Sequence, residues 1–325
     1  MSALVVGSGT WGTALAVVLA RAGREVTLLC RRSEIAEQLR LGTHPSFPGV
    51  TLPDGIETRV FGEPLPAVEF AISTVPTQKL RGVLSEIAPT LPKDVPWVTG
   101  SKGLEIGTQS LPSQILGEFG IRLEVAILSG PSHAEEVIRN VPTAVSLGIT
   151  DPELATFLQE RISDATFRVY TNSDPIGVEW GGVLKNVVAI ASGIAIGLGF
   201  GDNTIAALVA RGAVEMARLG VDLGGHRETF SGLSGVGDLI VTCFSEHSRN
   251  RAFGIRIGAG ENPSALLDDS NQVVEGVHTT RAVHELREKR SIEMPIAEEV
   301  FQIIYGGRGA AEGVEALLNR SLKEE

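Results

Sequence analysis

The sequence predicts an α/β fold for the first half of the chain and an all-helical fold for the second half. Short apolar runs alternate with segments of helical periodicity up to about residue 172. A glycine-rich turn follows the first of these runs. After residue 173 the apolar runs become long and rich in Ala and Gly, and strand signals largely vanish. Alternating strands and helices over such a length indicate a parallel, doubly wound sheet.

The length of 325 residues is typical of two domains. The pattern changes near residues 172–180, so we predict a sheet domain over residues 1–175 and a helical domain over residues 176–325. Helices are predicted at Trp11–Arg21 and from an N-cap at Ser33 to about Leu41. The segment Gly42–Pro66, rich in Pro and Gly, is predicted to contain little helix. The predicted strands are Ala3–Val6, Glu25–Cys30, Phe70–Ser73, Pro96–Thr99, Val125–Leu128, Thr143–Leu147 and Phe167–Tyr170.

Composition and charge exclude several classes of protein. The 39 acidic residues exceed the 28 basic ones, which argues against nonspecific nucleic-acid binding. Cys30 and Cys243 are the two cysteines, so a disulfide scaffold is excluded and a reduced, cytoplasmic compartment is expected. No signal peptide is visible. The longest apolar stretch, Val187–Phe200, is shorter than the roughly 20 residues that span a bilayer, so we interpret it as a buried helix and expect no membrane insertion.

The glycine-rich turn indicates dinucleotide binding. Residues 7–12 read Gly-Ser-Gly-Thr-Trp-Gly and match the G-x-G-x-x-G pattern, between a predicted strand and a predicted helix. Gly7 allows the tight turn, Gly9 lets a pyrophosphate approach the backbone, and Gly12 lets the helix pack close to the sheet. The free N–H groups of the helix N-terminus favour phosphate. The first domain is therefore predicted to be of the Rossmann type.

Arg31 and Arg32 follow the second strand, where an NAD-specific site commonly has Asp or Glu. A guanidinium suits a 2′-phosphate. We expect NADP(H) to be preferred, with NAD(H) possible. The alternative is that both are simply exposed arginines.

Further polar groups stand where strands end or helices begin. Lys102 follows one predicted strand, and Gly130 with Ser132 follows the next, with a helix predicted to start near Ser132. Lys185 lies in a strongly apolar segment, where an unpaired charge is costly and where burial suits a lysine to acid–base chemistry. Asp238 could hold a nearby lysine. A natural phosphate-binding group is formed by Ser248, Arg249 and Asn250. Each alone has a simpler alternative. Lys102 and Arg249 could be solvated, Asp238 could cap a helix, and Lys185 could extend its ammonium to the surface.

Taken together, the sequence resembles the bacterial-type NAD(P)-dependent glycerol-3-phosphate dehydrogenases over essentially the whole chain. That family implies a Rossmann-type domain plus an all-α domain, similar to 6-phosphogluconate dehydrogenase. It implies reversible reduction of dihydroxyacetone phosphate to sn-glycerol 3-phosphate, which feeds glycerophospholipid synthesis. The matching stretches are Gly7–Ala16, Ser101–Glu105, Ser129–Glu136, Leu184–Val187, Gly235–Leu239 and Ser248–Asn250.

The resemblance also implies roles for single residues. Lys185 is the proton donor and acceptor, and Lys102, Asp238 and Thr242 complete the catalytic set. The substrate is implied to contact Lys102, Gly130, Ser132, Lys185, Asn186, Asp238, Ser248, Arg249 and Asn250. The cofactor is implied to contact the turn residues Gly7, Gly9, Thr10, Trp11 and Gly12, together with Arg31, Arg32, Lys102, Ala134, Arg249, Val273 and Glu275.

The chain departs from the family pattern at Ser101, His133 and Val236, none of which removes a catalytic group. The histidines lack metal-ligand spacing and no metal is expected, so they are interpreted as structural, as are the cysteines. Large apolar helices make a homodimer plausible. Two other functions stay open at this point. One is a related dehydrogenase acting on a β-hydroxy acid or a ketopantoate-like substrate, and the other is an NAD(P)H-sensing regulator without turnover.

Overall fold

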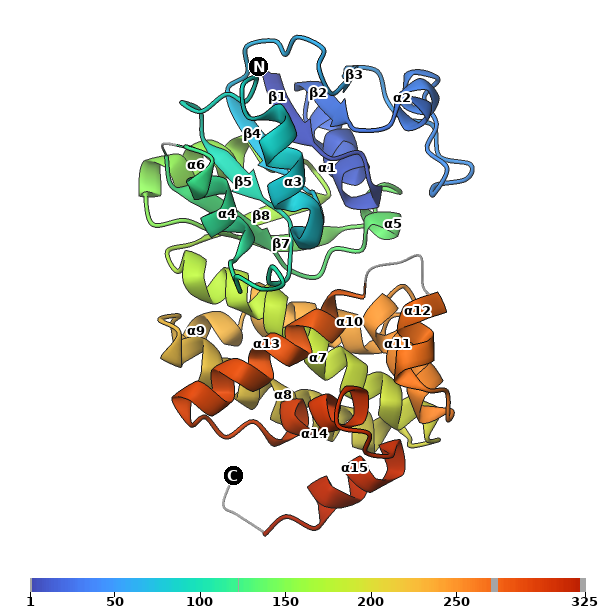
Figure 1. The fold of residues 1–325 in the computed structure, drawn as a ribbon. Coiled ribbons are helices and arrows are strands. Elements are labelled where there is room, and N and C mark those ends of the chain that lie inside the picture. Colours follow the sequence, from blue (N-terminus) through green and yellow to red (C-terminus); the bar gives the residue numbers. More distant parts are fainter. Residues whose placement is uncertain (1, 122, 270–273, 322–325) are drawn as a thin grey trace. The chain divides into compact units, whose positions relative to one another are not determined.

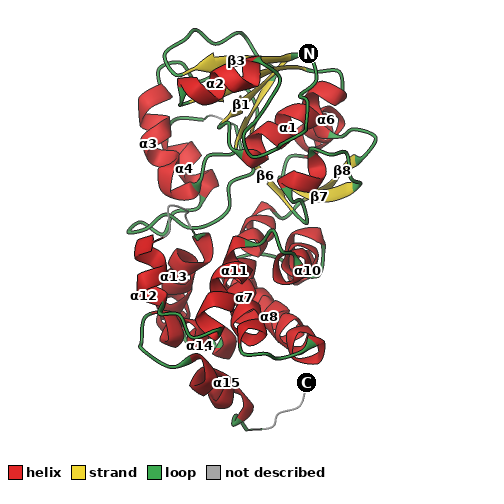
Figure 2. Ribbon diagram, turned by 90° about the vertical axis from the view of Figure 1, so that its right-hand side faces the viewer, coloured by secondary structure: helices red, strands yellow, loops and turns green. Residues whose placement is uncertain are grey.

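The computed structural model describes residues 2–121, 123–269 and 274–321 (Figure 1). The chain divides into two compact units, Met1–Glu179 and Trp180–Glu325. The first unit combines a sheet with helices. The second is helical throughout its described residues, as the colouring of Figure 2 shows. The predicted fold class, an α/β half followed by an all-α half, is confirmed.

The first unit is built on one eight-stranded sheet with the order β3-β2-β1-β4-β5-β6-β7-β8. The order runs outward from β1 on one side and from β4 on the other, so these two strands meet at the switch point of the sheet. Leu4 in β1 pairs with Thr27 on one side and with Ala71 on the other. The strands are β1 (Ser2–Val6), β2 (Glu25–Cys30), β3 (Ile56–Val60), β4 (Phe70–Ser73), β5 (Trp97–Thr99), β6 (Val125–Ser129), β7 (Thr143–Gly148) and β8 (Phe167–Asn172).

Helices cover both faces of this sheet. Successive side chains of β1 point to opposite faces, so Ala3 and Val5 join one core cluster while Leu4 and Val6 join another. The first cluster includes residues of α1 (Thr10–Arg21), α2 (Ser33–Arg40), α5 (Ala134–Val137) and α6 (Pro152–Ile162). The second includes residues of α3 (Thr77–Ile87) and α4 (Pro112–Glu118). The sheet is therefore doubly wound.

Two features of the sheet differ from the sequence prediction. Strand β3 lies inside the segment Gly42–Pro66 and was missed, because it is a half-exposed edge strand that pairs with β2 alone. The sheet is also not wholly parallel, since β7 runs antiparallel to β6. The connection between them holds only the four-residue helix α5, which spans about 6 Å and cannot carry the chain back along a strand.

Two predicted helix starts are wrong by one or two residues. Helix α2 has Arg32 as its N-cap, so Ser33 is its first residue and not its cap. The helix expected near Ser132 begins at Ala134, with His133 as its N-cap. Neither difference moves a residue of the predicted site to another element.

The second unit is organised around α7 (Pro175–Gly197), whose first turn still belongs to the first unit. This helix is long and apolar enough to cross a membrane, but 83% of its most apolar window is buried inside the protein, as in a core helix. The other helices of this unit are α8 (Asp202–Asp222), α9 (Arg227–Phe230), the π-helix η1 (Leu233–Gly237), α10 (Asp238–Phe244), α11 (Arg249–Gly258), α12 (Pro263–Asp269), α13 (Glu275–Arg290), α14 (Pro295–Ile304) and α15 (Ala310–Leu318).

Candidate active site

The glycine turn of the first unit has the geometry that its sequence predicts. Gly7 has a φ of +109°, which favours glycine, and its amide donates to the carbonyl of Leu29. A Cβ on Gly12 would lie 1.9 Å from the carbonyl oxygen of Gly7, so only glycine allows α1 to begin this close to the turn. A Cβ on Gly9 would meet no atom within 4 Å. The backbone is therefore open at the position where a phosphate would approach.

Thr74 supports this turn and was missed by the sequence analysis. It follows β4, the strand that neighbours β1, and its Oγ1 lies 3.1 Å from the carbonyl oxygens of both Val6 and Gly7. Its amide also donates to Val6. The one available signal was its place directly after a strand at the switch point, where ligand-binding loops gather.

The two arginines after β2 lie at the surface of the first unit. Both Arg31 and Arg32 are exposed, and neither side chain forms an ion pair or hydrogen bond with any residue that the structure describes. The last residue of the strand, Cys30, is buried. Two guanidinium groups are thus available to an anion at the end of β2.

The loops after β5 and β6 bring three predicted residues together. Lys102 extends its Nζ to 3.5 Å from the carbonyl oxygen of Gly130, and Ser132 Oγ donates to the same oxygen at 3.0 Å. Gly130 has a φ of +144°, and a Cβ there would lie 3.0 Å from the backbone of Val145. Lys102 is itself positioned by Thr77, whose hydroxyl donates to its carbonyl at 3.0 Å.

Trp11 connects the glycine turn to these loops. It is the second residue of α1, and a Cβ on Gly100 would lie 2.7 Å from its indole nitrogen. Gly100 directly precedes the segment that carries Lys102. Thr10 begins α1, and Ala134, which begins α5, is buried. The predicted cofactor and substrate residues of the first unit therefore lie around the carboxyl ends of its central strands.

In the second unit, Lys185, Asp238 and Thr242 form one buried cluster. The ammonium of Lys185 on α7 is paired with the carboxylate of Asp238, and it donates to Thr242 Oγ1 at 2.9 Å. The Thr242 hydroxyl donates in turn to the carbonyl of Asp238 at 2.6 Å, which leaves its oxygen lone pairs for the lysine. The side chains of Lys185 and Asp238 are 9% and 2% exposed.

Close backbone packing sets this contact. A Cβ on Gly181 would lie 2.5 Å from the carbonyl oxygen of Ser234, so α7 and η1 touch at that point. Lys185 stands four residues after Gly181, and Asp238 four residues after Ser234. Positions four apart share a helix face, so the glycine contact brings the lysine and the aspartate opposite each other.

The predicted phosphate-binding group lies at the start of α11. Ser248 is the N-cap of this helix, and its hydroxyl oxygen accepts from the amide of Arg251 at 3.2 Å. Arg249 is exposed. Asn250 donates to the side-chain oxygen of Asn186 and accepts from the amide of Gly276, each at 2.9 Å. The two predicted asparagines thus orient each other.

Two predicted cofactor residues belong to the stretch of sequence that leads into α13. Val273 lies outside the described residues. Glu275 begins α13, and its Oε2 is buried with no hydrogen-bond partner among the described residues. Burial raises the pKa of Glu275 to about 7, although the charge of Arg249 acts to lower it. A buried carboxyl oxygen without a partner is costly and points to a ligand contact.

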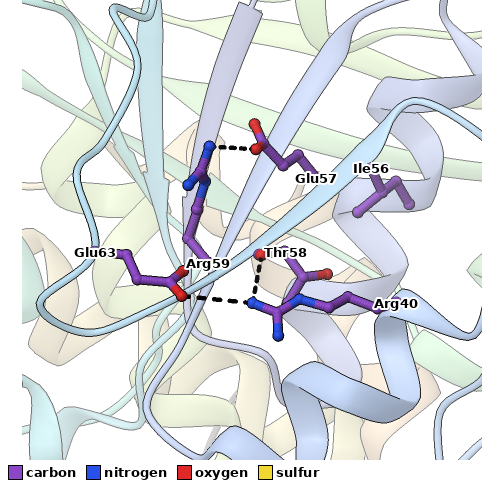
Figure 3. Close-up of a pocket in the computed structure, with 6 residues that line it drawn as sticks. All are labelled: Arg40, Ile56, Glu57, Thr58, Arg59 and Glu63. Atoms are coloured by element: carbon purple, nitrogen blue, oxygen red, sulfur yellow. Dashed lines mark hydrogen bonds and ion pairs between the residues drawn. The ribbon is translucent and has the colours of Figure 1, made fainter.

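A separate cavity of about 360 Å³ lies against the edge strand β3 (Figure 3). Its charged side chains largely pair among themselves. Arg40 donates to the carbonyl of Thr58 at 3.2 Å and lies 3.7 Å from Glu63, and Arg59 is paired with Glu57. No residue predicted for cofactor or substrate lines it, and we assign it no function. Across the described residues, no group of three or more His, Cys, Asp or Glu could hold a metal ion.

Comparison with known proteins identifies the family. The model of the NAD-dependent glycerol-3-phosphate dehydrogenase N-terminus matches residues 2–155, and that of the C-terminus matches residues 174–315. A glycerol-3-phosphate dehydrogenase (NAD(P)+) of Moorella thermoacetica is 48% identical over 100% of this chain and 97% of its own length. One of Halothermothrix orenii is 43% identical over 99% of this chain and 95% of its own length.

A solved structure agrees with these relatives. The crystal structure of glycerol-3-phosphate dehydrogenase from Coxiella burnetii is 37% identical, with a TM-score of 0.90 over 98% of this chain and 99% of its own. These matches favour an oxidoreductase of this kind over the two other functions that the sequence left open. The chain belongs to the NAD(P)-dependent glycerol-3-phosphate dehydrogenase family.

Proposed function

We propose that the enzyme reversibly reduces dihydroxyacetone phosphate with NAD(P)H to sn-glycerol 3-phosphate, and that Lys185 exchanges the proton. The observation that carries this proposal is the buried cluster in which Asp238 and Thr242 hold the Lys185 ammonium. Reduction places negative charge on the carbonyl oxygen of the substrate. A positioned ammonium stabilises that charge and supplies the proton. In this direction the product would feed glycerophospholipid synthesis.

The residues of the first unit fit the nicotinamide dinucleotide that the family uses. The open position at Gly9 leaves room for a pyrophosphate. The N-terminus of α1 has no side-chain cap and no acidic residue in its first turn, so its N–H groups and dipole favour an anion. The bound nicotinamide supplies or accepts the hydride. Proposed contacts are Gly7, Gly9, Thr10, Trp11, Gly12, Lys102 and Ala134 from the first unit, and Arg249, Val273 and Glu275 from the second.

We further propose that NADP(H) is preferred and NAD(H) possible. The exposed, unpaired guanidinium groups of Arg31 and Arg32 support this preference, because they follow the strand whose end usually carries an acidic residue in NAD-specific sites.

The substrate phosphate is assigned to the start of α11. Arg249 offers a cation at a helix N-terminus, and the Ser248 hydroxyl, although its oxygen caps the helix, donates its proton to no described residue. Binding there is remote from the reacting carbon, so it can orient the carbonyl. Other proposed substrate contacts are Lys102, Gly130, Ser132, Asn186 and Asn250.

A homodimer and a cytoplasmic location also remain proposals. An apolar cavity of about 320 Å³ supports an apolar contact with a second copy. It is lined by Leu198 and Phe200, which follow α7, and by four residues along α15. Both cysteines are free and buried, which suits a reducing compartment.

The test of the catalytic proposal removes the Lys185 charge. We expect Lys185→Met to lower kcat for oxidation of NADPH by dihydroxyacetone phosphate by at least about 100-fold, the scale of general acid catalysis. The Kd for NADPH should change less than about threefold. Lys289→Met on α13 is the control, because Lys289 is exposed.

Loss of one partner leaves Asp238 buried without its counter-ion, which commonly costs about 3–5 kcal/mol of stability. The double variant Lys185→Met with Asp238→Asn removes both charges and keeps the test available if the single variant does not fold. Turnover within about tenfold of the wild type in either folded variant would rule out Lys185 as the proton donor.

A further inference from the structure

His44 lies in the loop between α2 and β3, and the sequence analysis assigned it a structural role only. His44 is 6% exposed, and its imidazole contacts the glycine turn: Nε2 lies 3.2 Å from the carbonyl oxygen of Ser8. We propose that His44 is a positioning residue for the cofactor, which fixes the Ser8–Gly9 peptide so that the Gly9 amide is presented to the pyrophosphate. This inference rests on the proposed cofactor site at the glycine turn.

The tautomer of His44 follows from its second contact. The amide of Ser46 donates to Nδ1 at 3.1 Å, so Nδ1 carries no proton. The neutral ring therefore has its proton on Nε2 and donates it to Ser8. Burial, followed by the charge of Arg32, lowers the pKa of His44, which keeps the ring in this neutral form.

The ring and the backbone of His44 are both held in place. Phe47 lies in the core with its ring centroid 5.1 Å from that of His44, and its amide donates to the His44 carbonyl at 2.9 Å. Pro45 restricts the backbone of His44 to extended conformations. The loop is thus anchored in the core of the first unit, and the imidazole reaches from a fixed base to Ser8.

Fixing the Ser8 carbonyl also fixes the next amide. A trans peptide is planar, so the N–H of Gly9 points opposite to the C=O of Ser8. Within the described chain, the Gly9 amide donates to no protein atom, and the space around the Gly9 Cβ position is open. An amide held in this way is an anion donor that needs no reorganisation when phosphate binds. Without His44 the peptide could rotate and turn its carbonyl oxygen toward the phosphate.

Two substitutions separate the two contacts of the ring. Asn at position 44 can place Oδ1 near the position of Nδ1 and keep the bond from Ser46, but it is too short to reach Ser8. Gln can place an N–H donor near the position of Nε2. We expect His44→Asn to raise the Kd for NADPH about three- to tenfold, the effect of one neutral hydrogen bond, and His44→Gln to stay within about twofold of the wild type.

The readouts are the Kd from NADPH fluorescence titration, the melting temperature, and kcat with the KM for dihydroxyacetone phosphate at saturating NADPH. A positioning role predicts a change in the cofactor Kd with kcat and substrate KM unchanged. Equal loss of affinity in both variants, in proportion to a lower melting temperature, would show a purely structural role and overturn the inference. Wild-type affinity in His44→Asn would also overturn it.

Gly9→Val distinguishes this inference from the cofactor site itself. Gly9 has φ −77° and ψ −176°, which any residue adopts, and the added side chain meets no protein atom within 4 Å of its Cβ. It would occupy only the space proposed for pyrophosphate. Weak NADPH binding by Gly9→Val together with wild-type binding by His44→Asn would leave the cofactor site standing and reject the role of His44. Wild-type binding by both would reject the cofactor site.

Discussion

The buried ion pair between Lys185 and Asp238 is not an effective way to stabilise the fold. Removing two charges from water costs several kcal/mol each, and an apolar pair of similar volume is often as stable. The side chains are almost fully buried, so solvent does little to reduce that cost. Thr242 satisfies a further hydrogen bond of the ammonium, which orients it. An arrangement that is costly for folding and well oriented is what acid–base chemistry needs.

The proposed preference for NADP(H) depends on two single residues after β2. Replacing Arg31 or Arg32 by Ala should lower kcat/KM for NADPH by about 10- to 100-fold, because a charge-assisted bond to the 2′-phosphate is worth about 1.5–3 kcal/mol. The kcat/KM for NADH should change less than about threefold, since the ribose of NADH carries a 2′-hydroxyl in place of the phosphate. Steady-state kinetics with both cofactors measure this, with Arg227→Ala on α9 as an exposed control of equal charge change. Equal losses for both cofactors, or a wild-type preference for NADH, would contradict the proposed preference.

At this scale the sequence identifies residue types but not their partners. Lys185 and Asp238 are 53 positions apart, and only the fold shows that they touch. Thr74 and His44 were missed because each acts on a distant backbone carbonyl, and no local pattern marks such a contact. The motifs proposed to bind ligands could be recognised from the sequence. The residues that contact the backbone of those motifs could not.

Among the elements, α7 shows how packing overrides local preference. Glycine costs a helix about 1 kcal/mol relative to Ala, yet α7 continues through Gly193 to Gly197. The reason lies on α11, where Gly254 and Gly258 face them: a Cβ on Gly254 would lie 2.2 Å from the Ile190 carbonyl. Gly193 and Gly197, which interrupt the apolar stretch Val187–Phe200, therefore mark a close contact between two backbones.

Gly254→Ala should test this crossing. The added methyl would collide with the backbone of α7, which cannot move aside easily. We therefore expect a loss of about 1–3 kcal/mol in the free energy of unfolding. Because Asn250 lies one turn earlier on α11, the KM for dihydroxyacetone phosphate should also rise. The matched control is Gly82→Ala on α3, where a Cβ meets nothing within 4 Å and helix propensity predicts a gain of up to about 1 kcal/mol. Urea denaturation compares the two, and equal stability of both variants would show that α11 has room to move.

The direction of each strand could not be predicted from the sequence, because it too depends on how elements pack and connect. A strand at Thr143–Leu147 was predicted from its apolar run, but the antiparallel pairing of β7 with β6 depends on how far the intervening chain can travel. The edge strand Ile56–Val60 lacked a continuous apolar run, because only Thr58 within it is buried. Strands with an apolar run were found, including the edge strand β8, whereas the edge strand β3, which has one buried residue, was not.

For the whole molecule, the change from strands to helices was readable from composition, whereas the limit of the first compact unit depends on packing. The sequence places the boundary after residue 175, where α7 begins. The first unit extends to Glu179 because the first turn of α7 packs on it: a Cβ on Gly148 would lie 2.9 Å from both Pro175 Cα and Val178 Cβ. Glu179 also accepts from the amide and hydroxyl of Ser113, at 3.0 and 2.6 Å.

This buried carboxyl makes global stability depend on pH. Desolvation raises the pKa of Glu179 to about 7 in the folded protein, although the Ser113 bonds act to lower it, while an unfolded Glu titrates near 4.5. Between these values the folded state binds a proton that the unfolded state does not. Its contribution to stability is therefore fully present below about pH 4.5, is lost progressively as pH rises toward 7, and no longer changes above 7.

Glu179→Gln removes this titration while its amide can still accept from the Ser113 amide and donate to the Ser113 hydroxyl. We expect the free energy of unfolding of the wild type, relative to the variant, to rise by about 3 kcal/mol from pH 8 to pH 5, because each pKa unit is worth about 1.4 kcal/mol. Taking the difference between the two proteins cancels the pH-dependent contribution of the histidines, which both proteins share. Urea denaturation at each pH measures it, with the exposed Glu160→Gln on α6 as control. A difference that stays constant with pH, or that grows toward pH 8, would show that Glu179 is ionised in the folded protein and that the Ser113 bonds outweigh its burial.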